Sequence, residues 1–196
     1  MSVRVIGPRD PRPEGTIDTT SRSRTWSRGL SPFFLGPVPL YPGAPVPTAT
    51  CVENAWQYSK VYPEHVGFDG NPSPAYFEWA TKGWQDPRAA RYPMGKGRKP
   101  EYSWWAGERL TYIQAREKVY LPLYVQAVLA SSAWGTLLTL YRASEELVLW
   151  DFDGYDHKKL GMTFAEVVRC ESRKMGHALV LAVLLEKSGS SGDGPE

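Results

Sequence analysis

The sequence has little cysteine, no dominant sign of charge and no long apolar run. Of its 196 residues only two are cysteines, which excludes a disulfide framework and a four-cysteine zinc site. A reducing compartment is therefore the simpler expectation. Lysine and arginine number 23 against 21 for aspartate and glutamate, so the overall charge gives no reason to expect nucleic acid or an acidic membrane as a partner.

Two further absences concern membranes. The longest apolar run, residues 178–185, is far too short to span a bilayer. The first residues lack the apolar core of a signal peptide. We therefore expect a cytoplasmic protein that has no membrane partner, and its length fits one domain with a core of its own.

Local composition divides the chain into three parts. Residues 1–28 carry six arginines and three prolines but few apolar residues, so they predict a mobile basic arm with one short strand at Val3–Ile6. Residues 29–187 are expected to form a single globular domain. The glycine- and serine-rich residues 188–196 predict a flexible tail.

The domain is expected to be α+β and predominantly helical, with a few short strands. The stretch 31–50 is apolar but interrupted by prolines, which excludes a helix and favours edge strands and turns. Pro74 suits the first position of a helix, and Thr163 with Glu166 has the capping-box pattern. Helices are expected over residues 52–62, 74–84, 104–130, 133–143, 163–174 and 176–187, and a short strand over 146–150.

An apolar run that ends in aspartates, LVLWDFDGYDH at residues 147–157, has the look of a phosphotransferase or metal loop. Only about 40 residues follow it, which is too few for the sheet that such a phosphotransferase needs. The spacing of Asp151, Asp153 and Asp156 does not match a calcium loop, so no metal site is assigned. A turn in which these aspartates accept backbone N–H bonds is the structural alternative.

A second polar cluster lies in the segment VENAWQYSKVY, residues 52–62. If the segment is helical, Glu53, Gln57 and Lys60 lie above one another on one face, and Trp56 flanks them. A carboxylate, an amide and an ammonium beside an indole suit a sugar-phosphate ligand. A solvated polar stripe on a surface helix explains the spacing equally well.

This segment resembles the opening motif of the NADAR, or YbiA-like, domain family, Val-Glu-His-Ala-(Tyr/Phe)-Gln-x-x-Lys. Later stretches follow in the family's order, over about residues 50–170: the pair Trp104-Trp105 before a long helix, then TLLTLY, LVLWDFDG and LGMTFAEVVR. Asn54 stands where the family has histidine. The resemblance implies a YbiA-like single domain.

The resemblance also implies a hydrolase that cleaves the N-glycosidic bond of a ribosyl–base or ADP-ribosyl substrate in nucleotide metabolism, with no cofactor. Breaking the C1′–N bond develops oxocarbenium charge on the ribose, which a nearby carboxylate stabilises. Glu53 is the first candidate for this carboxylate, and Asp151 or Asp153 is the second. The side chains expected to bind the substrate are Trp56, Gln57, Lys60, Trp105, Trp150, Arg91 and Lys96.

Residues 88–99, RAARYPMGKGRK, form an irregular basic stretch that includes Arg91 and Lys96. Gly95 and Gly97 would let the backbone approach an anion closely, although the spacing of a Walker loop is missing. The sequence is compatible with two interpretations of this stretch, a phosphate clamp and a solvated basic loop.

Two other functions therefore stay open beside the glycosidase. One is a binding module that recognises ADP-ribose or a nucleotide without turnover. The other is a nucleic-acid-associated protein that grips phosphates with the basic arm and the 88–99 stretch, which would bind DNA with a steep salt dependence.

Overall fold

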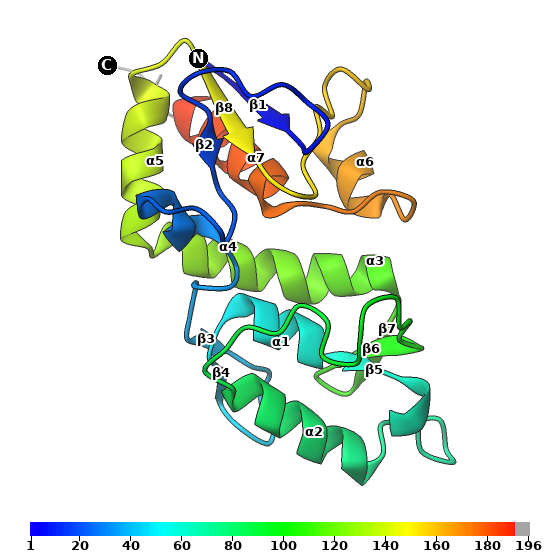
Figure 1. Ribbon diagram of the computed structural model, residues 1–196. Coiled ribbons are helices and arrows are strands. Elements are labelled where there is room, and N and C mark those ends of the chain that lie inside the picture. Colours follow the sequence, from blue (N-terminus) through cyan, green and yellow to red (C-terminus); the bar gives the residue numbers. More distant parts are fainter. Residues whose placement is uncertain (191–196) are drawn as a thin grey trace. The chain divides into compact units, whose positions relative to one another are not determined.

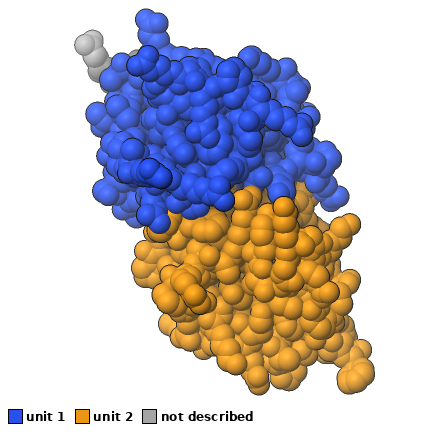
Figure 2. All heavy atoms as spheres, viewed as in Figure 1, with its two compact units in different colours: residues 1–31, 128–196 blue, residues 32–127 orange. Residues whose placement is uncertain are grey.

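The computed structural model describes residues 1–190, and the chain divides into two compact units (Figures 1 and 2). Unit 1 takes residues 1–31 and 128–196, and unit 2 takes residues 32–127. Both units combine helices with short strands, and more residues lie in helices than in strands. The mixed α+β class expected from the sequence is confirmed.

Unit 1 is built around a parallel sheet of three strands, β1 (Ser2–Ile6), β8 (Glu146–Trp150) and β2 (Ile17–Asp18). The order is β1-β8-β2, and both outer strands run parallel to β8. The central strand is apolar at four successive positions because a central parallel strand is covered on both faces.

The short strand expected at Val3–Ile6 is confirmed as part of β1, but the N-terminal segment differs from the mobile arm expected for residues 1–28. Val3 pairs with Leu147 and Val5 with Leu149, and Val3, Val5 and Ile6 are buried. These few apolar residues find partners more than 140 positions away along the chain. Their pairing with β8 orders the start of the chain, although the residues that follow are mostly polar.

Within unit 1, helix α7 (His177–Ser190) packs against β1 and β8. Thr163 accepts a hydrogen bond from the backbone N–H of Glu166, and the Glu166 carboxylate accepts one from the N–H of Thr163, which confirms the capping box. The helices of this part are η1 (Trp26–Leu30), α5 (Ser132–Arg142), α6 (Phe164–Arg169) and α7 (His177–Ser190).

Unit 2 contains two antiparallel sheets and several short helices. One sheet pairs β3 (Val38–Pro39) with β4 (Thr48–Ala49), as expected for the proline-rich stretch. The other has the order β5-β6-β7 and comprises β5 (Lys60–Val61), β6 (Tyr102–Trp105) and β7 (Glu108–Leu110). The helices are α1 (Val52–Tyr58), η2 (Pro63–His65), α2 (Pro74–Gln85), α3 (Tyr112–Ala115) and a π-helical turn, Arg116–Tyr120, that leads into α4 (Leu121–Leu129).

The prediction of a long helix over residues 104–130 is wrong for residues 104–111. Trp104 and Trp105 lie in β6, which turns back into β7 through Ala106 and Gly107. Both turn residues have positive φ, 50° and 86°, as in a tight hairpin. The helical spacing therefore holds only from Tyr112 onward.

Helices α1 and α2 pack closely in unit 2 because α2 has a glycine at the contact. A Cβ atom on Gly83 would lie 2.0 Å from Cε1 of Tyr58. As expected, Pro74 occupies the first turn of α2, and Ser73 caps the helix by accepting from the N–H of Tyr76. The buried indole of Trp84 lies in the last turn of the same helix.

The flexible tail expected over residues 188–196 overlaps the last turn of α7 up to Ser190, and its remaining residues lie outside the described part. Within residues 1–190, no single helix is long and apolar enough to cross a membrane. One bent pair, Tyr112–Leu129 with Ser132–Arg142, meets that test by length and composition alone.

Candidate functional site

The polar residues of the segment 52–62 come from a helix and the strand after it. Helix α1 ends at Tyr58, and Lys60 opens strand β5 instead of continuing the helical face. The N-cap residue of α1 is Cys51. Glu53 and Gln57 are one turn apart on α1, so their side chains still share a face.

These side chains form a buried row of hydrogen bonds. Nε2 of Gln57 donates to Oε1 of Glu53 over 2.8 Å, and Nζ of Lys60 donates to Oε1 of Gln57 over 2.7 Å. Glu53 is only 6% exposed and Gln57 only 7%. A solvated stripe is thereby excluded, since the carboxylate and the amide are both withdrawn from water.

Burial changes the acidity of this row. Desolvation lowers the pKa of Lys60 to about 8, while the nearby Glu53 carboxylate favours the ammonium and opposes this shift. The Lys60 ammonium also lies 4.8 Å from the centre of the Trp56 ring, within the range of a cation–π contact. An amine with this pKa exchanges a proton close to neutral pH.

Aromatic rings and an arginine lie next to Trp56. The Trp56 ring centre is 5.5 Å from that of Tyr120 and 6.2 Å from that of Tyr112. The Arg116 guanidinium lies 4.3 Å from the Tyr112 ring centre and donates to the Tyr112 hydroxyl over 2.7 Å. Arg116 is 2% exposed, and no sequence pattern singled it out because it falls within a run of helical spacing.

Trp105, an expected substrate-binding residue, lies in β6 of the same unit. Its ring centre is 5.0 Å from that of Tyr41 in an edge-on arrangement, and Tyr41 meets Trp84 at 6.4 Å. These contacts account for Trp105 as a packing residue. A role in substrate binding stays a prediction.

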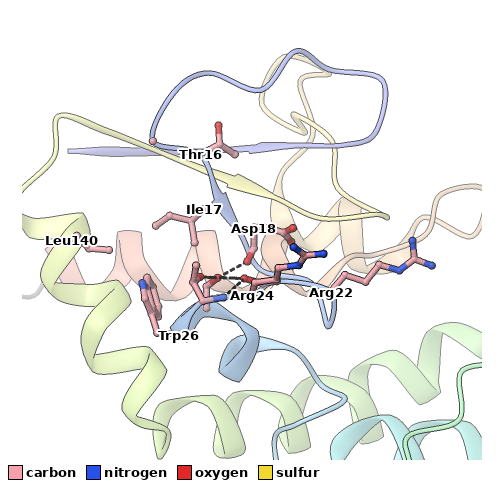
Figure 3. Close-up of a pocket in the computed structure, with 11 residues that line it drawn as sticks. Thr16, Ile17, Asp18, Arg22, Arg24, Trp26 and Leu140 are labelled. Atoms are coloured by element: carbon pink, nitrogen blue, oxygen red, sulfur yellow. Dashed lines mark hydrogen bonds between the residues drawn. The ribbon is translucent and has the colours of Figure 1, made fainter.

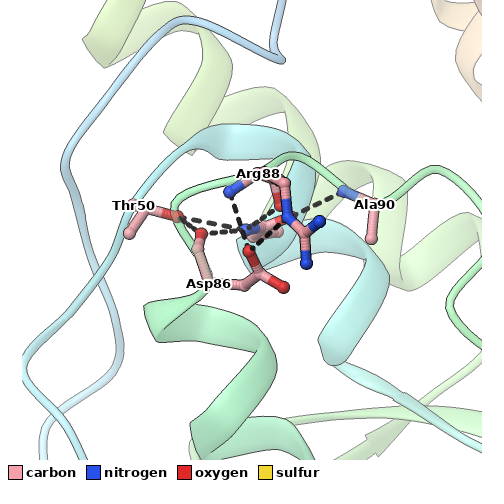
Figure 4. Close-up of polar contacts among 5 residues, drawn as sticks. Thr50, Asp86, Arg88 and Ala90 are labelled. Atoms are coloured by element: carbon pink, nitrogen blue, oxygen red, sulfur yellow. Dashed lines mark hydrogen bonds and ion pairs between the residues drawn. The ribbon is translucent and has the colours of Figure 1, made fainter.

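Asn54, next to Glu53 on α1, organises the loop that follows α2 (Figure 4). Its amide donates to the backbone oxygens of Asp86 and Arg88 over 2.9 and 3.2 Å, and to Oγ1 of Thr50 over 3.0 Å. Its Oδ1 accepts from the N–H of Ala90 over 3.0 Å. This fully buried side chain therefore holds the start of the basic stretch in place, a role that the sequence did not indicate.

The basic stretch itself is an irregular loop. The Arg91 guanidinium lies 5.5 Å from the Tyr92 ring centre, and Lys96 is exposed. Gly95 and Gly97 have φ values of 96° and 88°, which glycine adopts readily. The contacts of this loop favour neither the clamp nor the solvated loop.

The acidic turn that follows β8 belongs to unit 1. Oδ2 of Asp151 accepts from the N–H of Ala178 over 3.2 Å and lies 3.1 Å from Nδ1 of His177. Oδ1 of Asp151 accepts from the N–H of Asp153 over 3.3 Å. Asp151 therefore accepts backbone N–H bonds, as expected if these aspartates have a structural role. Its carboxylate holds the start of α7 in place.

Trp150 and Asp153 have contacts of their own in unit 1. Trp150 is buried with Ile6 and Val148, and the Arg12 guanidinium lies 3.4 Å from its ring centre. Asp153 forms an ion pair of 3.7 Å with Lys174. Since Glu53 lies in unit 2, a site that joins it to these residues stays a prediction.

A hollow of about 490 Å³ in unit 1 lies between residues 15–18, residues 22–27 and Leu140 (Figure 3). Trp26, Ile17 and Leu140 form its apolar end. The hydroxyls of Ser23, Thr25 and Ser27 are within 3.1 Å of one another, and Ser27 donates to the backbone oxygen of Asp18. These three hydroxyls already form hydrogen bonds within the protein, so we assign no ligand to the hollow.

Among residues 1–190, no group of three or more His, Cys, Asp and Glu side chains is arranged to hold a metal ion. Cys51 is buried in unit 2 and Cys170 is half-buried in unit 1.

Comparison with family models corrects the expected relationship to the NADAR domain. Residues 10–165 match the model described as "Family of unknown function (DUF6939)". No curated protein and no solved structure matches the chain. The NADAR assignment is wrong, and the YbiA-like fold that it implied stays a prediction. Only the first of the similar stretches is specific, and Asn54 departs from its motif. The match covers more than half of the sequence, and the chain belongs to the DUF6939 family.

Proposed function

We propose that the protein hydrolyses an N-glycosidic bond at the ribose of a nucleotide-type substrate, without a cofactor, and that Glu53 is the catalytic carboxylate. One observation carries this proposal, namely the buried row in which Gln57 joins the Glu53 carboxylate to the Lys60 ammonium. The proposal rests on the chemistry of that row and no longer on any family relationship.

Each member of the row has a task in this reaction. A carboxylate withdrawn from water stabilises the positive charge that develops on the ribose, and it can take a proton from the attacking water. Lys60, with a pKa of about 8, can give a proton to the departing base near neutral pH. The Trp56 ring offers a surface on which a base stacks.

Gln57 fixes the distance between the two charged groups. Its amide donates to the Glu53 carboxylate and accepts from the Lys60 ammonium, and so bridges the anionic and the cationic group. A substrate would therefore meet one anionic and one cationic group at two different points.

Two alternative functions make different predictions. The row is already hydrogen-bonded within the protein, which also suits a module that binds ADP-ribose or a nucleotide without turnover. A nucleic-acid-associated function would instead use the basic residues of segment 1–28 and the 88–99 stretch, and would show a steep salt dependence. For the glycosidase function we also propose a cytoplasmic location.

The test is release of free base from an ADP-ribosylated guanine nucleotide and from a pyrimidine riboside phosphate. We expect Glu53→Gln, which keeps the shape of the side chain, to lose at least about a hundredfold in turnover. Glu78→Gln, which removes an exposed carboxylate from α2 of the same unit, is the matched control and should leave turnover unchanged. Equal turnover in the wild type and Glu53→Gln would overturn the assignment of Glu53.

Calorimetry separates the alternatives. Binding of ADP-ribose with no base released identifies the binding module. Absence of both, together with DNA binding that weakens steeply with salt, identifies the nucleic-acid function.

A further inference from the structure

We propose that Tyr112 binds the base of the substrate beside Trp56, and that it makes the site selective for ribosides whose departing base is aromatic. This inference rests on the proposed function, because it adds one neighbouring side chain to the row of Glu53, Gln57 and Lys60. All of these residues belong to unit 2. No sequence spacing indicated a role for Tyr112.

Tyr112 lies close to the row because it contacts Trp56. It is the first residue of α3, and its ring centre is 6.2 Å from that of Trp56, with an angle of 45° between the ring planes. The Lys60 ammonium lies 4.8 Å from the centre of the same indole. One aromatic ring therefore separates Tyr112 from the ammonium at the end of the row.

A buried arginine holds the Tyr112 ring. Nη2 of Arg116 donates to the Tyr112 hydroxyl over 2.7 Å, and the guanidinium lies 4.3 Å from the ring centre. Arg116 is 2% exposed and is the first residue of the π-helical turn, a kind of turn that is frequent at functional sites. The tyrosine ring is thus fixed by a cation that the protein itself encloses.

The backbone of Tyr112 is fixed as well, because a capping box starts α3. The hydroxyl of Thr111 accepts from the N–H of Gln114 over 3.3 Å, and the Gln114 side chain accepts from the N–H of Thr111 over 2.9 Å. Both the backbone and the ring are therefore ordered before a ligand arrives, which reduces the entropy lost on binding.

Tyr112 is nevertheless 43% exposed, and Trp56 beside it is half-buried. Exposed side chains usually change rotamer freely, and ordering one costs conformational entropy. Here an exposed aromatic ring is held in one place next to a second ring and a charged row. Such a surface favours stacking of a base, which contributes roughly tenfold to a hundredfold in affinity.

This surface selects substrates by their leaving group. An aromatic base has a π face that stacks on tyrosine and tryptophan, whereas the alcohol released from a simple glycoside has none. A base stacked beside Trp56 would also lie near the Lys60 ammonium, which gives it a proton in the proposed reaction. The expected substrates are therefore ribosides of aromatic bases.

The test measures binding of two probes to the full chain by isothermal titration calorimetry. AMP carries a base, and ribose 5-phosphate is the same sugar phosphate without one. We expect the wild type to bind AMP at least about tenfold more tightly than ribose 5-phosphate, and Tyr112→Leu to lose at least about tenfold in affinity for AMP alone. Tyr112→Phe keeps the ring, so it should bind AMP within about threefold of the wild type.

Phe68→Leu is the matched control, because it removes a fully exposed ring from another part of unit 2 and should change neither affinity. Thermal unfolding checks that the variants fold like the wild type. The inference is overturned if the wild type binds AMP no more tightly than ribose 5-phosphate, or if Tyr112→Leu binds AMP as tightly as the control does. Equal losses in Tyr112→Phe and Tyr112→Leu would overturn it too, since the ring would then not be the group that binds.

These binding measurements do not depend on turnover. If the wild type releases no base but Tyr112→Leu still loses AMP affinity, the hydrolytic function is wrong and the role of Tyr112 stands. If the wild type releases base and Tyr112→Leu releases it with the same kcat/KM, Tyr112 is not part of the site and the assignment of Glu53 is unaffected.

Discussion

The Asp151 carboxylate lies 3.1 Å from Nδ1 of His177, and both side chains are buried. The other ring nitrogen of His177 lies 2.7 Å from the backbone oxygen of Thr19. The residue after β8, the first residue of α7 and the residue after β2 are thereby joined through one imidazole. A carboxylate that first looked catalytic connects three segments of unit 1.

The first prediction concerns this connection. Asp151→Ala removes the acceptor for the Ala178 N–H and leaves the His177 ring without its acidic partner, so we expect a loss of about 3–5 kcal/mol in the free energy of unfolding. Asp153→Ala, which breaks a partly exposed pair with Lys174, should cost about 1 kcal/mol or less. Urea denaturation measures both. Equal losses in the two variants would contradict the structural role of Asp151.

The second prediction uses two glycines that both lie in helices. Gly83→Ala would drive a methyl group into the Tyr58 ring, and we expect a loss of about 1–3 kcal/mol or more in the free energy of unfolding. Gly135 in α5 has no atom within 4 Å of an added Cβ, so Gly135→Ala should stabilise the protein by about 0.5–1 kcal/mol. Thermal and urea unfolding test the opposite signs. A stable Gly83→Ala variant would show that α1 and α2 pack less closely than described.

The third prediction concerns pH. The folded-state pKa of Lys60, about 8, lies below its ordinary value of 10.5. Between these values the unfolded chain binds more protons, so the contribution of Lys60 to the free energy of unfolding rises as the pH increases from about 8 to 10.5. Below pH 8 the cost of burying the ammonium is present in full.

Lys60→Met removes this dependence. We expect the stability of the variant relative to the wild type to be greatest at or below pH 8 and to decline towards pH 10. Lys82→Met, an exposed position on α2, serves as the control for removal of a lysine. A difference between wild type and Lys60→Met that is constant over this range would contradict the lowered pKa. In Glu53→Gln the pKa of Lys60 should fall further, because the carboxylate that favours the ammonium is gone.

The fourth prediction concerns Asn54. Asn54→Ala leaves the Ala90 N–H and the oxygens of Asp86 and Arg88 without this partner, at a cost on the order of 3 kcal/mol. Hydrogen exchange at the Ala90 amide should accelerate with the loss of stability. The matched control is Gln126→Ala, which removes an exposed amide on α4 and should change stability by less than about 0.5 kcal/mol. Unchanged protection at Ala90 would contradict the role of Asn54 in the loop.

Local rules predicted the elements that carry their own start signals. Pro74 opens α2, and Thr163 with Glu166 caps α6; both are local signals that act within a few residues, so the sequence pattern is sufficient. The hairpin of β6 and β7 was missed because Ala106 is not a usual turn residue at positive φ. The short strand at Val3–Ile6 was predicted, but its pairing with β8 was not, because that partner lies more than 140 positions away along the chain.

The candidate row was only partly predictable. The helical period predicts that Glu53 and Gln57 share one face of α1. Lys60 lies in strand β5, so the helical period does not predict that its side chain reaches Gln57. Asn54 and Arg116 were missed because their importance comes from burial, and an isolated polar residue gives no sign of burial in a sequence.

The division of the chain has a consequence for biosynthesis. Unit 2 is one continuous stretch, but the sheet of unit 1 takes β1 and β2 from the first residues and β8 from beyond residue 145. During translation the two outer strands leave the ribosome long before the strand that they flank, and their edges stay unpaired while the middle of the protein is made. The residues around these strands are rich in charge and proline, a composition that disfavours pairing of unpaired strand edges with other chains.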